Sequence, residues 1–392
     1  MDPATTSSRN ARRGLFHVEP ERRTVPGRTK ASTLDSRVHN RSLILATLYQ
    51  DGAMTRAELG RVTGLTAPTV SALVAELDQE GLLADIGPRE GVRRGKPAGL
   101  VRIVDDAVCV IALDLSHSDR FAGVITDLRG RVMARSQVPI GDALGTAAEK
   151  LVFLLAADLV DQAPRPVLGI GVGTPGIVDA EGVIRQAGHL EWTDLPLARR
   201  LTERFGVPAR VGNDINAATL GARHFRGVAA HNVMVVSIEH GVGAGLIVGG
   251  ELVEGEQFAA GEIGHVTVDD DGGPCICGRR GCLDLLIDAA HVRAALAAAG
   301  EAGHRGVLER AGRALGVVLA PIVSALNLNE IVLAGPADLV DGPFRESVAR
   351  TVQGRTLAPI SAAVAVRALG GDHDLIPLGA VGLVLSAELG VL

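Results

Sequence analysis

The sequence lacks the features that mark several protein classes. Its 392 residues include only four cysteines and three lysines. The longest uncharged apolar run, residues 314–326, spans about 13 positions and contains Pro321, so it is too short to cross a bilayer. The 47% of apolar residues and the few cysteines exclude disorder, collagen and small disulfide scaffolds for the bulk of the chain. No charged-then-apolar leader opens the sequence, and we expect a soluble, intracellular protein of two or three domains.

Charge is unevenly distributed along the chain. Residues 1–104 carry 16 Arg+Lys against 11 Asp+Glu, whereas residues 105–392 carry 23 against 34. A basic front joined to an acidic body indicates a polyanion-binding part appended to a domain that does not bind polyanions. Arginine outnumbers lysine by 36 to three, which we interpret as a compositional bias without mechanistic meaning.

The first 37 residues show no apolar periodicity. They contain eight basic and four acidic residues and three prolines. This composition predicts a disordered basic tail for residues 1–37, and a non-specific DNA-contacting arm is the alternative. Neither interpretation needs a fold.

Residues 38–104 have the pattern of three helices followed by a hairpin. Apolar spacing predicts a first helix over residues 38–51. Thr55 and Glu58 have the spacing of a capping box, and Thr66 is placed to cap a third helix. Two strands joined by a long basic loop follow, at residues 82–86 and 100–104. This order predicts a winged helix-turn-helix, with a three-helix protein-interaction module as the alternative.

Two segments of this domain carry candidate DNA contacts. The outward face of the third helix is small and hydroxylic, which suits close approach to base edges, and its candidates are Thr66, Thr69 and Ser71. The loop of the hairpin supplies cations that can neutralise phosphates, namely Arg93, Arg94 and Lys96. The sequence Arg94-Gly95-Lys96-Pro97 also fits a minor-groove hook, and both interpretations of the loop stay open.

After residue 104, strands and helices alternate. Three consecutive strands are predicted, then a helix and a buried strand, at residues 108–115, 121–127, 132–140, 143–159 and 167–172. Later strands are predicted at residues 233–238, 244–248 and 331–334, and later helices at 285–299 and 306–326. The alternation predicts an α/β architecture too long for one ordinary lobe.

Three of the four cysteines lie within eight residues, as Cys275-x-Cys277-Gly-x-x-Gly-Cys282, and His265 precedes them by ten. In a reducing compartment such a cluster favours a metal over a disulfide. Three thiolates and one imidazole complete the tetrahedral shell of a structural zinc site. A redox-active thiol cluster is the alternative. Cys109 lies in an apolar segment and is predicted to be inert.

The same residues carry a resemblance to a known family. The segment from Gly261 to His265 and the cysteine motif through Asp284 resemble the signature of the ROK family (repressors, open reading frames, kinases). Further matching segments follow in the family's order, at Thr174–Asp179, Trp192–Leu197 and Asn213–Asn216. With its front domain, the chain resembles the family's transcriptional regulators. The resemblance implies an N-terminal winged helix-turn-helix over residues 38–104, followed by a two-lobed actin/hexokinase-like (ribonuclease H-like) sugar-binding domain over residues 105–392.

The resemblance also implies roles for five residues. Asn213 and Asp214 match positions that hydrogen-bond sugar hydroxyls, although Asp214 alone would be interpreted as a loop carboxylate or helix cap. Glu262 and His265 match further hydroxyl ligands, and His265 would bind zinc through its other nitrogen. Asp284 stands where the family usually has glutamate, which shortens its reach toward the sugar.

In the family's kinases the Asp214 position is the catalytic base, and glycine-rich turns wrap the nucleotide phosphates. The equivalent first turn here is Asp114–Asp119, where residues with side chains replace both glycines. The second segment, Glu239–Gly245, opens with glutamate and histidine, and the third is Ala334-Gly335-Pro336. We therefore predict a cleft that senses a sugar without phosphorylating it, so that the protein is not an enzyme.

These observations predict a sugar-responsive transcriptional regulator of carbohydrate metabolism, most simply a repressor. It would bind a double-stranded DNA operator as a homodimer or higher oligomer, take a sugar or sugar derivative as ligand and hold structural Zn²⁺. We expect it in the cytoplasm, associated with the nucleoid and not with a membrane. The alternatives are an ATP-dependent sugar kinase that retains a DNA-binding head, and a DNA binder that is ligand-independent or controlled by a partner protein.

Overall fold

The computed structural model describes residues 33–88 and 99–392. The chain divides into two units, Met1–Asn40 and Arg41–Leu392. Of the first unit only the beginning of helix α1 (Thr33–Asp51) is described. This helix begins five residues before the position that apolar periodicity predicts, within the segment expected to be a disordered tail. No helix in the described stretches is long and apolar enough to cross a membrane.

The N-terminal domain has the predicted winged helix-turn-helix arrangement. Its remaining helices are α2 (Arg56–Thr63) and α3 (Ala67–Gln79), and its sheet, in the order β1-β3-β2, contains β1 (Met54–Thr55), β2 (Leu83–Pro88) and β3 (Gly99–Ile103). The capping box of Thr55 and Glu58 opens α2, and Gly64 ends it in the left-handed conformation. Local sequence signals therefore determine where these short helices begin and end.

A mixed five-stranded sheet in the order β11-β7-β4-β5-β6 forms the centre of the first lobe. Its strands are β4 (Cys109–Asp114), β5 (Arg120–Thr126), β6 (Val132–Pro139), β7 (Val167–Thr174) and β11 (Ala209–Asn213). Its helices are α4 (Gly145–Gln162), α5 (Leu197–Phe205), α6 (Asp214–Phe225) and α12 (Leu375–Leu389). A small sheet adds β8 (Ile177–Val178), β9 (Ile184–Ala187) and β10 (Trp192–Leu195), with the 3-10 turn η1 (Gly188–Leu190).

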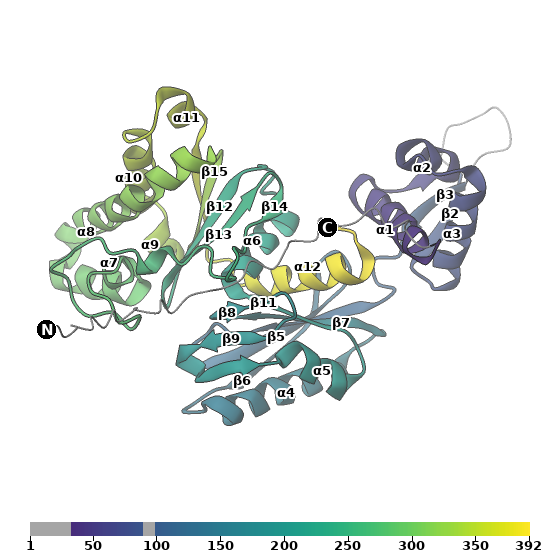
Figure 1. Ribbon diagram of the computed structural model, residues 1–392, viewed down its shortest axis with the longest axis horizontal. Coiled ribbons are helices and arrows are strands. Elements are labelled where there is room, and N and C mark those ends of the chain that lie inside the picture. Colours follow the sequence, from purple (N-terminus) through teal and green to yellow (C-terminus); the bar gives the residue numbers. More distant parts are fainter. Residues whose placement is uncertain (1–32, 89–98) are drawn as a thin grey trace, which may run out of the picture. The chain divides into compact units, whose positions relative to one another are not determined.

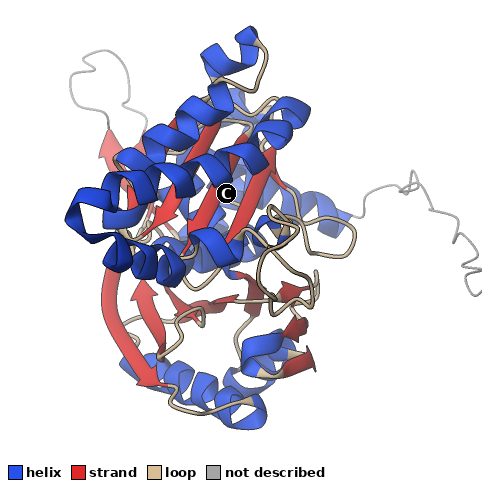
Figure 2. Cartoon of the chain, turned by 90° about the vertical axis from the view of Figure 1, so that its left-hand side faces the viewer, coloured by secondary structure: helices blue, strands red, loops and turns tan. Residues whose placement is uncertain are grey.

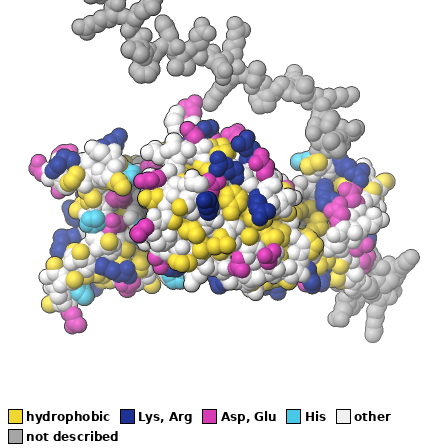
Figure 3. Space-filling model, turned by 90° about the horizontal axis from the view of Figure 1, so that it is seen from below, with side chains coloured by type: hydrophobic (Ala, Val, Ile, Leu, Met, Phe, Trp, Pro, Cys, Tyr) yellow, Lys and Arg dark blue, Asp and Glu magenta, His cyan; other side chains and the backbone are white. Residues whose placement is uncertain are grey.

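Helices cover both faces of this sheet. In Figure 1, α4 and α5 lie on one face and α12 on the other, and α12 packs against α6, β7 and β4. The outer face of α4 keeps some apolar side chains in contact with solvent, and Leu154 is 58% exposed. Figure 3, which views the molecule from that side, shows apolar side chains gathered there.

The second lobe repeats the strand arrangement of the first. Its sheet has the order β14-β13-β12-β15-β16 and contains β12 (Val233–Ile238), β13 (Val242–Val248), β14 (Glu251–Leu252), β15 (Glu330–Gly335) and β16 (Ala365–Gly370). In each lobe an antiparallel meander is extended by two parallel strands. The predicted two-lobed, ribonuclease H-like fold is therefore confirmed.

Helices shield the second sheet, as Figure 2 shows for the face turned toward the viewer. They are α7 (Asp284–Ile287), α8 (Ala289–Leu326), α9 (Ala337–Val340), α10 (Pro343–Gln353) and α11 (Ala358–Ala363), with the 3-10 turn η2 (Ile263–His265). The two helices predicted at 285–299 and 306–326 together form α8, which is interrupted at Gly300 by non-helical torsion angles. Cys109 is fully buried in β4, as expected of an inert core residue.

Candidate functional site

The face of α3 that sequence analysis assigns to DNA is exposed and polar. Thr66 and Ser71 are exposed, and Thr69 is half-buried. The hydroxyl of Thr66 accepts a hydrogen bond from the backbone N–H of Thr69, and the two hydroxyls lie 2.9 Å apart. Thr66 therefore caps the helix as predicted. The loop candidates Arg93, Arg94 and Lys96 lie outside the described residues.

The four predicted zinc ligands converge on one point. One ligand atom from each of His265, Cys275, Cys277 and Cys282 lies within 4.8 Å of all the others. The Sγ atoms of Cys277 and Cys282 are 3.6 Å apart, which is far longer than a disulfide. A tetrahedral site with Zn–S bonds of about 2.3 Å requires sulfur atoms separated by about 3.8 Å. The His-Cys₃ cluster therefore fits a zinc ion in both chemistry and spacing.

Two glycines let the segment before the cysteines pack against β13. Gly261 has φ +96°, and a Cβ there would lie 1.7 Å from the carbonyl oxygen of Ala244. A Cβ on Gly264 would lie 2.2 Å from the Asp284 carboxylate. No other residue type fits at either position without backbone movement. The close packing brings η2, which contains His265, alongside β13.

His265 lies in the metal cluster and next to Asp284. Its Nδ1 lies 3.6 Å from Sγ of Cys275 and 3.6 Å from a carboxylate oxygen of Asp284. The Nδ1 atom therefore faces the metal position and leaves Nε2 for another partner. Asp284 also accepts a 2.7 Å hydrogen bond from the backbone N–H of Val242. Its carboxylate thus fixes the start of β13.

Asn213 and Asp214 lie where β11 passes into α6. The Asn213 side chain caps this helix by accepting hydrogen bonds from the backbone N–H groups of Ile215 and Asn216, both at 3.0 Å. Its amide donates to the carbonyl of Gly176 at 3.0 Å. One amide N–H of Asn213 and one carboxylate oxygen of Asp214 remain for a ligand.

The acids of the cleft are close enough to influence one another. Burial, together with the charges of Asp114 and Glu262, raises the pKa of Asp214 to about 7. Burial also raises the pKa of Glu262 and of Asp284. Such a group of carboxylates in a low-dielectric cleft is stabilised by a ligand that donates hydrogen bonds.

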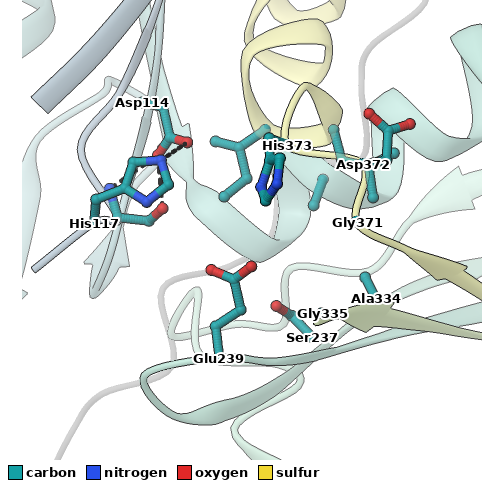
Figure 4. A pocket seen from close by; sticks show the side chains of 13 residues that line it. Asp114, His117, Ser237, Glu239, Ala334, Gly335, Gly371, Asp372 and His373 are labelled. Carbon is teal, nitrogen blue, oxygen red and sulfur yellow. Dashed lines mark hydrogen bonds and ion pairs between the residues drawn. The ribbon is translucent and has the colours of Figure 1, made fainter. Parts of the chain in front are cut away.

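On the nucleotide side of the cleft, side chains occupy the turn that sequence analysis compares with a phosphate loop. Asp114 accepts hydrogen bonds from the backbone N–H and hydroxyl of Ser116, and its other oxygen lies 3.3 Å from Nε2 of His117. This contact raises the pKa of His117. Figure 4 shows the Asp114–His117 pair facing Glu239 and His373 across the cavity. His373 carries no local pattern that could have marked it in the sequence.

The remaining space on this side is small. The cavity bounded by Asp114, His117, Glu239 and His373 has a volume of about 40 Å³. At roughly 10–15 Å³ for each water position, this volume corresponds to a few water molecules. At its rim, Oγ of Ser118 lies 3.0 Å from Nε2 of His240, so that one turn from each lobe meets the other.

Comparison with known proteins agrees with this arrangement. The model of the ROK family matches residues 110–386, which is most of the chain. The chain belongs to the ROK family. The MarR family model matches residues 39–95, the helix-turn-helix region.

Individual relatives extend the comparison. The xylose repressor of Bacillus spizizenii is 28% identical over 75% of this chain and 81% of its own length. The xylose repressor of Caldicellulosiruptor bescii is 30% identical over 62% of this chain, and the match spans 62% of that relative, less than two thirds. A crystal structure described as a ROK family transcriptional regulator, a homologue of the E. coli MLC protein, superposes with a TM-score of 0.78 over 91% of this chain and 99% of its own, at 20% identity.

Proposed function

We propose that this ROK-family protein is a sugar-responsive transcriptional regulator, a repressor that binds a double-stranded operator as a homodimer. The observation that carries this proposal is the contrast between the two sides of the cleft. The convergence of the His-Cys₃ cluster and the proximity of Asp214 to Glu262 support a sugar side, whereas side chains leave only a small cavity on the nucleotide side. The winged helix-turn-helix and the relatives named as repressors support the DNA-binding role.

The charge of the cleft favours a sugar without a phosphate or carboxylate group. The cavity on the nucleotide side, next to the proposed sugar site, is lined by Asp114, Glu239 and Asp372, by His117 and His373, and by no lysine or arginine. The acids assigned to sugar hydroxyls add further negative charge, and Arg226, the nearest partner of Asp372, is engaged in an ion pair with it. An anionic ligand would be repelled in such a site, whereas hydroxyl groups donate to carboxylates.

Zinc, when bound, would hold the Cys₃His loop in one conformation and fix the orientation of the His265 imidazole. Glu262, one turn away on the same loop, would then be held at the cleft. The sugar would make its strongest contacts in one arrangement of the two lobes. Preferential binding to that arrangement is sufficient to change operator affinity.

A sugar kinase is the second candidate, and one observation favours it. A pKa of about 7 at Asp214 suits a general base that deprotonates a hydroxyl. The same shift also follows from burial beside two other acids, so it does not require catalysis. The small cavity on the nucleotide side argues against a kinase.

One experiment separates these possibilities. Fluorescence anisotropy of labelled DNA from upstream of the protein's own gene is titrated with protein and then with matched pairs of sugars and sugar phosphates. We expect tight DNA binding that one neutral sugar changes and its phosphate does not. Sugar-dependent ADP release from ATP that is lost in Asp214→Asn would instead establish the kinase. Tight DNA binding that no sugar changes would leave a ligand-independent or partner-controlled regulator.

A further inference from the structure

A groove outside the cleft lies between α8 and α10, which are adjacent in Figure 1. It has a volume of about 660 Å³, within the range of small-ligand sites. Four of the nine residues that line it are arginines, Arg310 and Arg313 from α8 and Arg350 and Arg355 at the end of α10.

The two helices that form the groove are held at a fixed separation. A Cβ on Gly312 would lie 2.3 Å from the carbonyl oxygen of Phe344, and one on Gly316 would lie 2.6 Å from Cβ of Thr351. The helix backbones are therefore in direct contact at these glycines. Such packing leaves little freedom for the helices to move apart, so the arginines face one another from a rigid support.

The positive charge of the groove is largely uncompensated. Arg310, Arg313 and Arg355 make no side-chain hydrogen bond or ion pair with any residue that the structure describes. Arg350 lies 3.8 Å from Glu309, the one acid that lines the groove, and 3.8 Å from Glu346 on its own helix, and Glu309 is shared with Arg305 at 3.0 Å. Three of the four guanidinium groups are thus unpaired among the described residues, in a domain whose net charge is −11.

Arg350 lies in the last turn of α10 and Arg355 lies two residues beyond the helix, a region where cations interact favourably with the helix dipole. That explanation does not extend to Arg310 and Arg313, which lie in the middle of α8. Guanidinium groups present paired donors that match the oxygen atoms of phosphate groups.

We propose that this arginine groove binds a small molecule that carries two or more phosphate groups. A small anion is favoured over DNA because the surface on the α9–α10 side carries no excess of positive charge. Glu346, Asp341 and Asp338, whose side chains are 47%, 57% and 65% exposed, pair there with Arg350, Arg345 and Arg293. A long polyanion would gain no net attraction from these ion pairs, whereas a ligand confined to the groove meets the unpaired arginines.

Isothermal titration calorimetry of the full-length, zinc-loaded protein with inorganic pyrophosphate tests the proposal. We expect one binding event per chain, and a loss of affinity of about tenfold for each arginine removed, since a charge-assisted hydrogen bond is lost each time. The double variant Arg310→Ala/Arg313→Ala should therefore bind about 100-fold more weakly. Both side chains are exposed and unpaired, so the variant should keep the wild-type melting temperature.

Arg345→Ala is the matched control. Arg345 lies on α10 but pairs with Asp341 outside the groove at 2.7 Å, and its removal should leave pyrophosphate affinity unchanged. ADP and fructose 1,6-bisphosphate as further titrants distinguish a nucleotide from a sugar phosphate as the source of the phosphates.

Three results would overturn the proposal. They are no binding to the wild type, equal weakening in the control variant, and unchanged affinity in the double variant. If the double variant instead bound operator DNA more weakly, with a flatter salt dependence, while pyrophosphate did not bind, the groove would be a DNA-backbone contact. Because none of these outcomes depends on a sugar, they are separate from the test of the proposed function.

Discussion

Replacement of Asp214 by asparagine should stabilise the protein at alkaline pH, although the residue lies at the centre of the cleft. Burial and two neighbouring acids raise the pKa of Asp214 from its ordinary value of 3.8 to about 7. Its ionised form is thus disfavoured in the folded state relative to the unfolded chain. The contribution of the Asp214 carboxyl to the free energy of unfolding is fully present below pH 3.8, and it is lost as the pH rises toward 7.

The size of this stability change follows from the pKa shift of Asp214. One pKa unit corresponds to about 1.4 kcal/mol, so the free energy of unfolding loses about 4 kcal/mol by pH 8 and about 1.5 kcal/mol by pH 5. Asparagine carries no charge and keeps an oxygen that can accept from the N–H of Ile215. The advantage of Asp214→Asn over the wild type should therefore grow by about 2.5 kcal/mol between pH 5 and pH 8.

Urea unfolding followed by circular dichroism at pH 5 and pH 8, with zinc present, measures this difference. Any effect of the asparagine amide on stability that does not depend on pH is the same at pH 5 and pH 8, so it cancels when the two free-energy differences are subtracted. Asp341→Asn is the control, because Arg345 and the N–H of Gly342 lower the pKa of Asp341 from its ordinary value of 3.8. Its carboxylate is ionised at both pH 5 and pH 8, so any stability lost on removing that charge should be the same at the two pH values. An Asp214→Asn advantage that does not change with pH would refute the assigned environment of Asp214.

Four further results are expected. Cys277→Ser should lose bound zinc, which metal analysis measures, and should also lose the response to sugar. A zinc-free protein that still responds to sugar would contradict the role of the cluster. Gly261→Ala should lower the free energy of unfolding by about 2 kcal/mol or more, because the new Cβ would overlap the carbonyl of Ala244. If the variant is as stable as the wild type, the loop can move to make room for the Cβ. Glu262→Gln should lose the sugar response in the anisotropy assay and keep DNA binding, and equal loss of both would indicate misfolding. Arg94→Ala should reduce the slope of log affinity against log salt by about 0.9 if this arginine neutralises one phosphate, and an unchanged slope would remove it from the contacts.

Features encoded by neighbouring residues were predictable from the sequence. The capping box at Thr55 and Glu58 and the cap at Thr66 rely on hydrogen bonds within one helical turn, and the structure has all three. The zinc cluster was predictable because three ligands fall within eight residues, and the glycines between them indicate a tight loop. The ribonuclease H-like pairing of each sheet followed from the family resemblance and not from strand periodicity.

Features that depend on contacts between distant segments were not predictable. Ser118 and His240 meet across 122 positions, and His373 reaches the same cavity from the far end of the chain. The arginine groove has no local signal because arginine is abundant throughout the sequence. The helices predicted at 285–299 and 306–326 meet at Gly300 without the expected loop between them, and only the torsion angles of this glycine interrupt α8.

The filled nucleotide side and the intact zinc module have one functional explanation. A kinase must open to exchange two substrates, whereas a sensor needs only two states that differ in affinity for its ligand. If the sugar binds one arrangement of the lobes about 100-fold more tightly, it shifts the equilibrium by about 2.7 kcal/mol. In the proposed regulator, the Asp114–His117 contact at the position of the family's phosphate-binding glycines would remove a competing ligand, while Asp214, Glu262 and His265 would bind the polyol. The energy of sugar binding would then be available for changing DNA affinity.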